Sequence, residues 1–368
     1  MEEAARIWRS LLSSANITSA VKPRPGSAND SAKKRKTMKL KSRLLPGLCL
    51  GLLVAANSLE ACSQTAQPEY GANAITLADP TIFLDGDTYY LYGTSSPDGI
   101  LVYSSDDLEH WSGPCGARDG HALMKGDSWG TMGFWAPQVF SRNGKYYMAY
   151  TANEQIAIAE SDSPLGPFTQ DSIAHIPAEM KQIDPFVFFD DNGKAYLYHV
   201  RLLEGNRIYV AELNDDMRGI SEITAIECIS AEPGGWEDTA NAEWRVAEGP
   251  TVVKYAGGAR PLYYLFYSCN DFRNPDYAVG YATAPTPRGP WTRHEDNPLM
   301  SRKNLGYNGT GHGDIFTDKA GKLHYVLHTH SGPSQVQKRK TAVVDLIFDG
   351  NTYKADPATL RFLEASAP

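Results

Sequence analysis

Three acidic residues stand where strand-like runs begin, and a pair of carboxylates in one site can act as general acid and general base. Asp79 belongs to "ADPTIFLDGDTYYLYGTS", Asp184 to "IDPFVFFDDNGKAYLYHVR" and Glu248 to "EGPTVVKYAGGARPLYYLFYS". A single Asp-Pro pair is an ordinary way to open a turn and extend the chain. Turn chemistry does not explain a Glu at the corresponding place of a third run. We therefore interpret the three residues as candidate catalytic carboxylates.

Two more runs follow the same order of a chemically distinctive start, an apolar strand, a Gly-containing turn and an aromatic strand. They are "FWAPQVFSRNGKYYMAYTA", with Trp135, and "GHGDIFTDKAGKLHYVLHTH", with His312. The five starts are 49 to 64 residues apart, which suits one four-stranded propeller blade each, with longer loops. The sequence predicts an all-β, five-bladed β-propeller. A β-sandwich is the alternative, but it gives no reason for five similar hairpins.

In a propeller the first strand of each blade faces the central axis, so the five starts should converge at one end of a channel. One carboxylic acid there can protonate a departing glycosidic oxygen, while a carboxylate activates water or attacks the anomeric carbon. A third acidic group raises the pKa of the acid by like-charge repulsion. Trp135 could stack on a sugar ring. This ring predicts cleavage of a glycosidic bond without a required cofactor.

Composition restricts the class of partner and the number of domains. The chain has 368 residues, a formal charge of -8 and a pI near 5.6, which argue against a nucleic-acid partner. We expect a linker over residues 63–75 and one propeller domain over 76–368. Past the leader only Cys115, Cys228 and Cys269 remain, without C-x-x-C spacing, so neither a disulfide framework nor a zinc site is indicated.

The segment 38–62, "MKLKSRLLPGLCLGLLVAANSLEAC", has a basic start, a short apolar core and small residues, as an export signal does. Its end at Cys62 resembles a bacterial lipoprotein signal, although Glu60 fits that pattern poorly; plain cleavage nearby is the alternative. Residues 1–37 precede the signal, so we interpret them as an over-extended, disordered N-terminus. The expected location is the periplasm or the outer membrane of a bacterium, with a lipid anchor if Cys62 is modified. No protein partner is indicated.

The ordered set "ADPTIF", "FWAPQVF", "IDPFVFFDDNGKAYL", "EGPTVVK" and "GTGHGDIF" resembles glycoside hydrolase family 43, over about residues 76–366. The resemblance implies a five-bladed propeller enzyme acting on arabinose- and xylose-containing glycans. It places the general base on Asp79, the pKa modulator on Asp184 and the general acid on Glu248. It also implies inversion, with the acid and base carboxyls roughly 6.5–9.5 Å apart.

Four further residues are candidates for binding substrate. The resemblance makes Trp135 the aromatic wall of a sugar subsite, with core packing as the alternative. His312 corresponds to the family's axial histidine near a structural Ca²⁺ in the channel; a hydrogen-bonded core histidine is the alternative. Asn270, in "SCNDFRNPDYAVGYA", lines the cleft or caps a loop, as do Asp271 and Arg273. Arg201 holds sugar hydroxyls or neutralises Asp184.

The resulting hypothesis is an exported, inverting exo-glycosidase, with α-L-arabinofuranosidase favoured because no C-terminal β-sandwich follows the fifth blade. β-D-Xylosidase is the close alternative, followed by galactosidase and arabinanase specificities. A retaining propeller glycosidase would need carboxyls only about 5–5.5 Å apart. A non-catalytic glycan-binding lipoprotein is the alternative of another class, although a binder has no need of all three acids.

Overall fold

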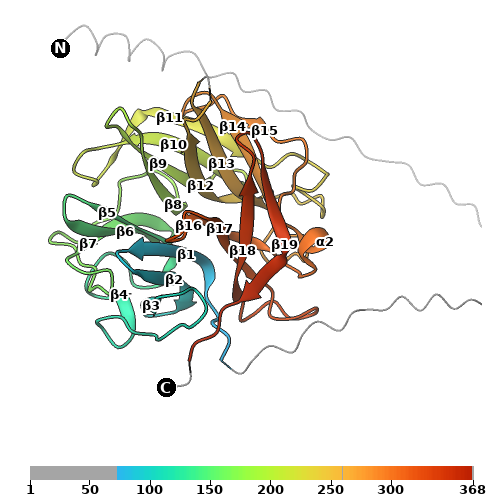
Figure 1. The fold of residues 1–368 in the computed structure, drawn as a ribbon. Coiled ribbons are helices and arrows are strands. Elements are labelled where there is room, and N and C mark those ends of the chain that lie inside the picture. The colour runs from blue at the N-terminus through green and yellow to red at the C-terminus, as the bar shows by residue number, and fades with distance from the viewer. Residues whose placement is uncertain (1–72, 259, 367–368) are drawn as a thin grey trace, which may run out of the picture. The chain divides into compact units, whose positions relative to one another are not determined.

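The computed structural model describes residues 73–258 and 260–366, whose strands form five antiparallel sheets around a centre (Figure 1). The predicted segments 1–37 and 38–62, and residues 63–72 of the predicted linker, lie outside the described residues. None of the helices described could span a membrane, being too short or too polar. The five sheets confirm the prediction of an all-β, five-bladed β-propeller.

Each sheet is one blade. Its strands are hydrogen-bonded in chain order, with the first strand of the blade nearest the centre. Blade 1 consists of β1 (Ala78–Asp85), β2 (Thr88–Ser96), β3 (Gly99–Ser105) and β4 (His121–Met124). Blade 2 has the three strands β5 (Trp135–Arg142), β6 (Lys145–Ala152) and β7 (Gln155–Ser161). Blade 3 consists of β8 (Gln182–Phe189), β9 (Ala195–Leu202), β10 (Asn206–Leu213) and β11 (Ile220–Ser230).

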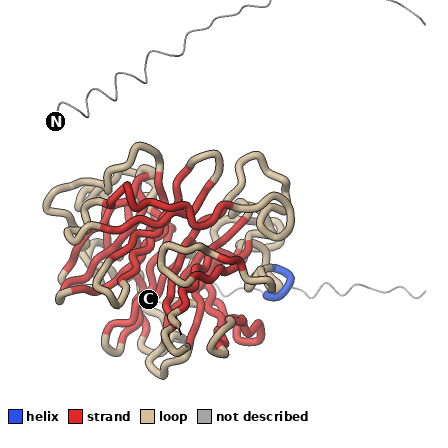
Figure 2. The backbone as a smooth tube through the Cα atoms, turned by 90° about the horizontal axis from the view of Figure 1, so that it is seen from above, coloured by secondary structure: helices blue, strands red, loops and turns tan. Residues whose placement is uncertain are grey.

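Blades 4 and 5 complete the ring with four strands each. Blade 4 consists of β12 (Ala247–Tyr255), β13 (Leu262–Cys269), β14 (Ala278–Ala284) and β15 (Thr292–Arg293). Blade 5 consists of β16 (Gly311–Thr317), β17 (Leu323–Thr329), β18 (Lys340–Phe348) and β19 (Tyr353–Phe362). The one helix among the described residues is the four-residue α2 (Arg302–Leu305), so the fold is built of strands and loops (Figure 2).

Tight turns fix the register of the inner hairpins. Between β5 and β6, Asn143 and Gly144 both have positive φ, at 54° and 76°, while Arg142 and Lys145 pair across the turn. Two left-handed residues in a two-residue loop define a type I′ turn, for which Asn-Gly is the preferred pair. The Asn-Gly dipeptide in the sequence thus specifies the innermost hairpin of blade 2.

The hydrophobic core is divided among the five interfaces between neighbouring blades. Tyr92 of β2 packs with Met148 of β6 between blades 1 and 2, and Tyr198 of β9 packs with Leu265 of β13 between blades 3 and 4. The other three clusters lie between blades 2 and 3, 4 and 5, and 5 and 1. Because each blade is buried on both faces, its strands carry long apolar runs, and the ring holds the starts of the inner strands in fixed positions.

The N-terminal end of the described chain joins blade 5 to blade 1. Ile75 N donates to Leu363 O at 2.8 Å, and Thr341 N of β18 donates to Ile75 O at 3.1 Å. Ile75 is buried in the core between these two blades, although the sequence assigned it to a linker. Leu77 is held to the same strand, because its N donates to Thr341 Oγ1 at 3.0 Å and its O accepts from that hydroxyl at 2.9 Å. The segment before β1 is therefore part of the ring, and Asp79 follows an anchored stretch of backbone.

Candidate active site

The five inner strands share one backbone feature near their starts. Each contains a residue with left-handed φ, and each shows a register irregularity at that place. These residues are Asp79 (49°), Ala136 (45°), Asp184 (55°), Gly249 (60°) and His312 (37°). Asp, Gly and His tolerate this conformation better than most residues do. A repeated bulge of this kind re-aims the side chains beside it toward the axis.

The bulges correct one detail of the sequence interpretation. Asp79, Asp184 and His312 occupy the left-handed position itself, whereas Trp135 and Glu248 come one residue before it. Proline follows the left-handed residue in the first four blades, so aligning the blades on this proline shows which residues occupy equivalent positions. Glu248 therefore leaves the backbone from a different position than the two aspartates, and its side chain approaches the same space from another direction.

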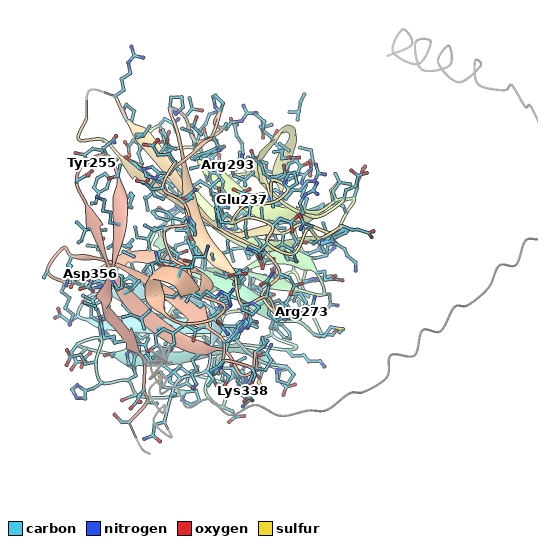
Figure 3. All side chains as sticks on the ribbon, turned by 90° about the vertical axis from the view of Figure 1, so that its right-hand side faces the viewer. Glu237, Tyr255, Arg273, Arg293, Lys338 and Asp356 are labelled. Atoms are coloured by element: carbon cyan, nitrogen blue, oxygen red, sulfur yellow. The ribbon has the colours of Figure 1, made fainter. Side chains whose placement is uncertain are left out.

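A pocket of about 560 Å³ lies where the inner strands begin. It brings together five of the seven site residues expected from the sequence, namely Asp79, Trp135, Asp184, Glu248 and His312. Below it, residues of all five bulges narrow the channel to a cavity of about 20 Å³, room for little more than one water molecule. Arg273 and Lys338 also line the pocket, and Figure 3 shows Arg273 on the opposite side of the molecule from Tyr255.

Asp79 is held ionised by the groups around it. Its Oδ1 lies 3.1 Å from Arg339 Nη1 and 3.4 Å from the Nδ1 atoms of both His312 and His328. Burial alone would raise the pKa of Asp79, but the charge of Arg339, with smaller effects of the two imidazoles, outweighs it and holds the pKa well below its usual range. Asp79 is therefore a carboxylate across the whole neutral range.

Asp184 and Glu248 are shifted in the opposite direction. Burial, followed by the charges of Glu248 and Asp79, raises the pKa of Asp184 well above its ordinary value. Burial also raises the pKa of Glu248 to about 7, although hydrogen bonds from Tyr277 and Asn206 oppose the shift. Asp184 Oδ2 accepts a bond of 3.2 Å from Gly249 N, which ties it to the backbone beside Glu248. Both acids are therefore shifted toward the protonated form, whereas Asp79 is shifted toward the carboxylate.

His312 lies beside the two aspartates, with Nδ1 3.4 Å from Asp79 Oδ1 and 3.8 Å from Asp184 Oδ2. Burial lowers its pKa, so the ring is neutral. A Cβ on Gly249 would come within 2.8 Å of the imidazole, and this glycine, at φ 60°, is therefore required by both space and backbone. Among the described residues there is no group of three His, Cys, Asp or Glu side chains that could hold a metal ion.

Trp135 is 37% exposed and lines the pocket, so the structure contradicts the core-packing alternative for this residue. Its indole also packs close to Gly133, where an added Cβ would come within 3.0 Å of the ring. An aromatic face open to a pocket with three acids is suited to the apolar side of a sugar ring.

Two residues expected to bind substrate do not line this pocket. Arg201 lies in a separate cavity on blade 3, where Nη2 donates to Glu222 at 2.9 Å and Nε donates to His199 at 3.1 Å. The Asn270 amide is fully used in holding loops, since its Oδ1 accepts from Thr239 N and its Nδ2 donates to Trp236 O and Asp276 O. The interpretation of both as cleft residues is corrected accordingly. Asn270 instead fixes the start of the segment 271–273, which does line the pocket.

Among the residues that sequence reasoning missed, four lie on loops or at strand ends and contact the site's carboxyl groups or line its pocket. Arg339 contacts Asp79 from 260 positions away, and Tyr277 OH donates to Glu248 Oε1 at 2.8 Å. Asn206 Nδ2 donates to Glu248 Oε2 at 2.8 Å, and Trp244 donates to Asn206. All four lie on loops or at strand ends outside the five repeated starts. The repeat could not indicate them, because no corresponding residue recurs in the other blades.

Comparisons with known proteins agree with the fold. The sequence model of glycosyl hydrolases family 43 matches residues 73–352. The crystal structure of an endo-1,4-beta-xylanase from Bacteroides thetaiotaomicron is 38% identical in sequence and has a TM-score of 0.73. The match covers 80% of this chain and 99% of the xylanase chain.

Two curated relatives are similar in sequence. Xylosidase/arabinosidase 43A of Humicola insolens is 31% identical over 231 residues, which are 52% of this chain and 66% of that protein. The extracellular exo-alpha-(1->5)-L-arabinofuranosidase ArbA of Cellvibrio japonicus is 25% identical over 330 residues, which are 76% of this chain and 86% of that protein. The names of these relatives refer to both arabinose- and xylose-directed enzymes.

Proposed function

The chain belongs to glycosyl hydrolases family 43, and on that premise we propose that it hydrolyses O-glycosidic bonds of pentose-containing plant glycans with inversion at the anomeric carbon. The observation that carries the proposal is the opposite direction of two pKa shifts in one pocket. Asp79 is held as a carboxylate by Arg339, while burial raises the pKa of Glu248 to about 7. Two carboxyl groups whose environments separate their pKa values have the assignment of base and acid built in.

In the proposed reaction, Asp79 takes a proton from a water molecule as that oxygen attacks the anomeric carbon. The bond from this carbon to the leaving oxygen breaks, and Glu248 gives its proton to that oxygen. We assign the modulating role to Asp184, because it interacts electrostatically with Glu248 and its bond to Gly249 N fixes its position next to the acid. Water is the only co-substrate of this reaction.

We propose α-L-arabinofuranosides as the first substrates, with β-D-xylosides as the alternative. Support comes from relatives named as xylosidase/arabinosidase and as an exo-acting arabinofuranosidase. The similarity to a protein named an endo-1,4-beta-xylanase makes internal cleavage of xylan a further alternative. Trp135 would provide the stacking face for the sugar in each case.

We further propose that the protein is exported, and anchored by lipid if Cys62 is modified. The support is the sequence 38–62 alone. Expression of the full chain and of a Cys62→Ala variant in a Gram-negative bacterium, followed by membrane fractionation and labelling with radioactive palmitate, tests this proposal. Loss of membrane-bound, labelled protein in the variant is expected. Equal fractionation and no label in either form would contradict the anchor.

A panel of aryl glycosides tests the activity. The wild-type enzyme should hydrolyse 4-nitrophenyl α-L-arabinofuranoside or β-D-xyloside, and arabinoxylan and xylo-oligosaccharides distinguish terminal from internal cleavage. Proton NMR of the first-formed anomer separates inversion from retention. Glycan binding without turnover would favour the non-catalytic binder instead.

Glu248→Gln is the matched test of the acid, because glutamine keeps the shape and removes the proton. Loss of general acid catalysis typically costs about 10²- to 10⁴-fold in rate. The loss should appear with a poor leaving group and be small with 2,4-dinitrophenolate, which leaves without protonation. An equal loss with both leaving groups would contradict the role of Glu248.

A further inference from the structure

A half-exposed tryptophan at the pocket reaches Glu248 through one intervening amide. Trp244 is 50% exposed and lines the pocket. Its indole Nε1 donates to Asn206 Oδ1 at 2.8 Å, and Asn206 Nδ2 donates to Glu248 Oε2, also at 2.8 Å. These two bonds connect the surface of the pocket mouth to the carboxyl group proposed as the acid.

The chemistry of the indole fixes the orientation of the amide. An indole N–H can only donate, so it selects the carbonyl oxygen of an asparagine and leaves the NH₂ group to face the other way. The backbone of Asn206 is also anchored, because its N donates to Arg245 O at 2.9 Å and it forms a bridge with Val246. With both the backbone and the carbonyl oxygen held, the NH₂ group must face Glu248.

We propose that Trp244 is a positioning residue for the general acid, acting through Asn206, which it holds as a hydrogen-bond donor to Glu248. The inference rests on the proposed glycosidase function. Trp244 does not itself touch the reacting atoms in this scheme. Its task is to prevent the amide of Asn206 from turning its oxygen toward the acid.

The orientation matters because the two faces of an amide have opposite effects on a carboxyl group. The NH₂ group stabilises the carboxylate and cannot accept the acid's proton, so that proton stays available to the leaving oxygen. A turned amide would offer Oδ1, which accepts a bond from the protonated acid, stabilises the neutral form and draws the proton away from the substrate. Glu248 Oε1 is held separately by the hydroxyl of Tyr277.

Other groups around Glu248 do not replace this contact. Those that interact with it electrostatically or line the same pocket are Asp79 on β1, Asp184 on β8, Cys269 at the end of β13, Asp271, Arg273 and Tyr277 between β13 and β14, His312 on β16, and Lys338 and Arg339 before β18. Only Tyr277 and Asn206 donate hydrogen bonds to the carboxyl group among the described residues. Loss of the Asn206 donor is therefore expected to change the titration of Glu248.

The experiment compares Trp244→Phe, Asn206→Ala and the double variant. Phenylalanine keeps an aromatic face and deletes only the N–H, and Trp135→Phe makes the same deletion at a pocket tryptophan that is not bonded to Asn206. The alkaline limb of kcat/KM reports the acid in the free enzyme. It should move up by about one pH unit in both single variants, as expected for loss of one hydrogen bond to a charged group, and no further in the double variant. Trp135→Phe should leave this limb in place.

The hydrolysis rate of the variants should fall for substrates with a poor leaving group and change little for a 2,4-dinitrophenyl glycoside. Only a poor leaving group needs the proton of the acid. A change in KM or in melting temperature without movement of the alkaline limb would overturn the proposal. It would also be overturned if the shifts of this limb in the two single variants added up in the double variant. Because Trp244 is half exposed, Trp244→Phe is expected to fold; Asn206→Ala carries the same test if it does not.

A readout without turnover separates this proposal from the proposed function. The side-chain ¹³C carboxyl resonance of Glu248, identified by its loss in Glu248→Gln, can be titrated in each variant. An upward shift in Trp244→Phe together with no glycosidase activity in the wild type would support the positioning role and refute the proposed function. Activity without any shift would do the reverse.

Discussion

Replacement of Arg339 by methionine should convert Asp79 from a permanent carboxylate into a group that titrates within the working range of the enzyme. Arg339 Nη1 and Asp79 Oδ1 are 3.1 Å apart, and each side chain is only 10% exposed. At an effective dielectric constant of about 20, a pair at this distance attracts by about 5 kcal/mol, equivalent to about four pKa units. Water in the pocket screens part of this, and opposite charges in such sites usually lower a carboxyl pKa by about 1–3 units.

The direction in which the acidic limb of the pH profile moves follows from the need for Asp79 to be ionised. With Arg339 the pKa of Asp79 is depressed, so the base stays ionised as the pH falls through the ordinary range of aspartates. Without it, burial dominates and the pKa rises. The acidic limb of kcat/KM should therefore move up by about 1–3 pH units in Arg339→Met, while the alkaline limb, which reports Glu248, moves less. Arg339→Lys keeps the charge and is the matched control.

Stability gives an independent measure of the same pair. Removal of one partner from a buried ion pair typically costs about 3–5 kcal/mol, because the other charge stays buried without compensation. Asp79 has a depressed pKa in the folded state, so its contribution is present above the unfolded pKa and is lost as the pH falls toward the folded one. Denaturant unfolding should thus show a large loss at pH 7 and a smaller one at pH 3. The reasoning would be refuted if Arg339→Met had the same acidic limb and the same free energy of unfolding as the wild type.

Three other changes should have distinct outcomes. Asp184→Asn keeps an acceptor for Gly249 N but removes a negative charge, so the pKa of Glu248 should fall and the alkaline limb of kcat/KM should move down by about one pH unit; an unchanged limb would contradict the modulating role. Gly249→Ala places a Cβ 2.8 Å from the His312 ring at φ 60°, so thermal unfolding should show a loss of about 1–3 kcal/mol, whereas Gly144→Ala, with open space around it, should show only the smaller backbone cost. Dialysis against EDTA tests the expected Ca²⁺ near His312: a loss of kcat that Ca²⁺ restores would support an ion held partly by water and backbone oxygens, whereas an unchanged kcat would contradict it.

The sequence predicted what repeats and missed what does not repeat. The five similar hairpins indicated the propeller, and its geometry brings together Asp79, Asp184 and Glu248, which are far apart in the chain. Arg201 was misplaced because the sequence cannot show which face of β9 meets the neighbouring blade, and it points to Glu222 instead. Arg339 comes from a single loop before β18, so no periodic signal marked it. Contacts from such loops depend on the closed ring and cannot be read from local patterns.

The closed ring also explains how similar blades produce carboxyl groups with opposite properties. Asp79 and Asp184 occupy the same left-handed position, yet burial is overcome at the first and prevails at the second. The difference comes from blade 5, which supplies Arg339 directly to Asp79. Glu248 has no salt-bridge partner among the residues described, and neutral donors alone hold it, so burial raises its pKa. The cation on this loop is thus the largest single contribution that keeps one acid of the ring ionised, while burial shifts the other two toward the protonated form.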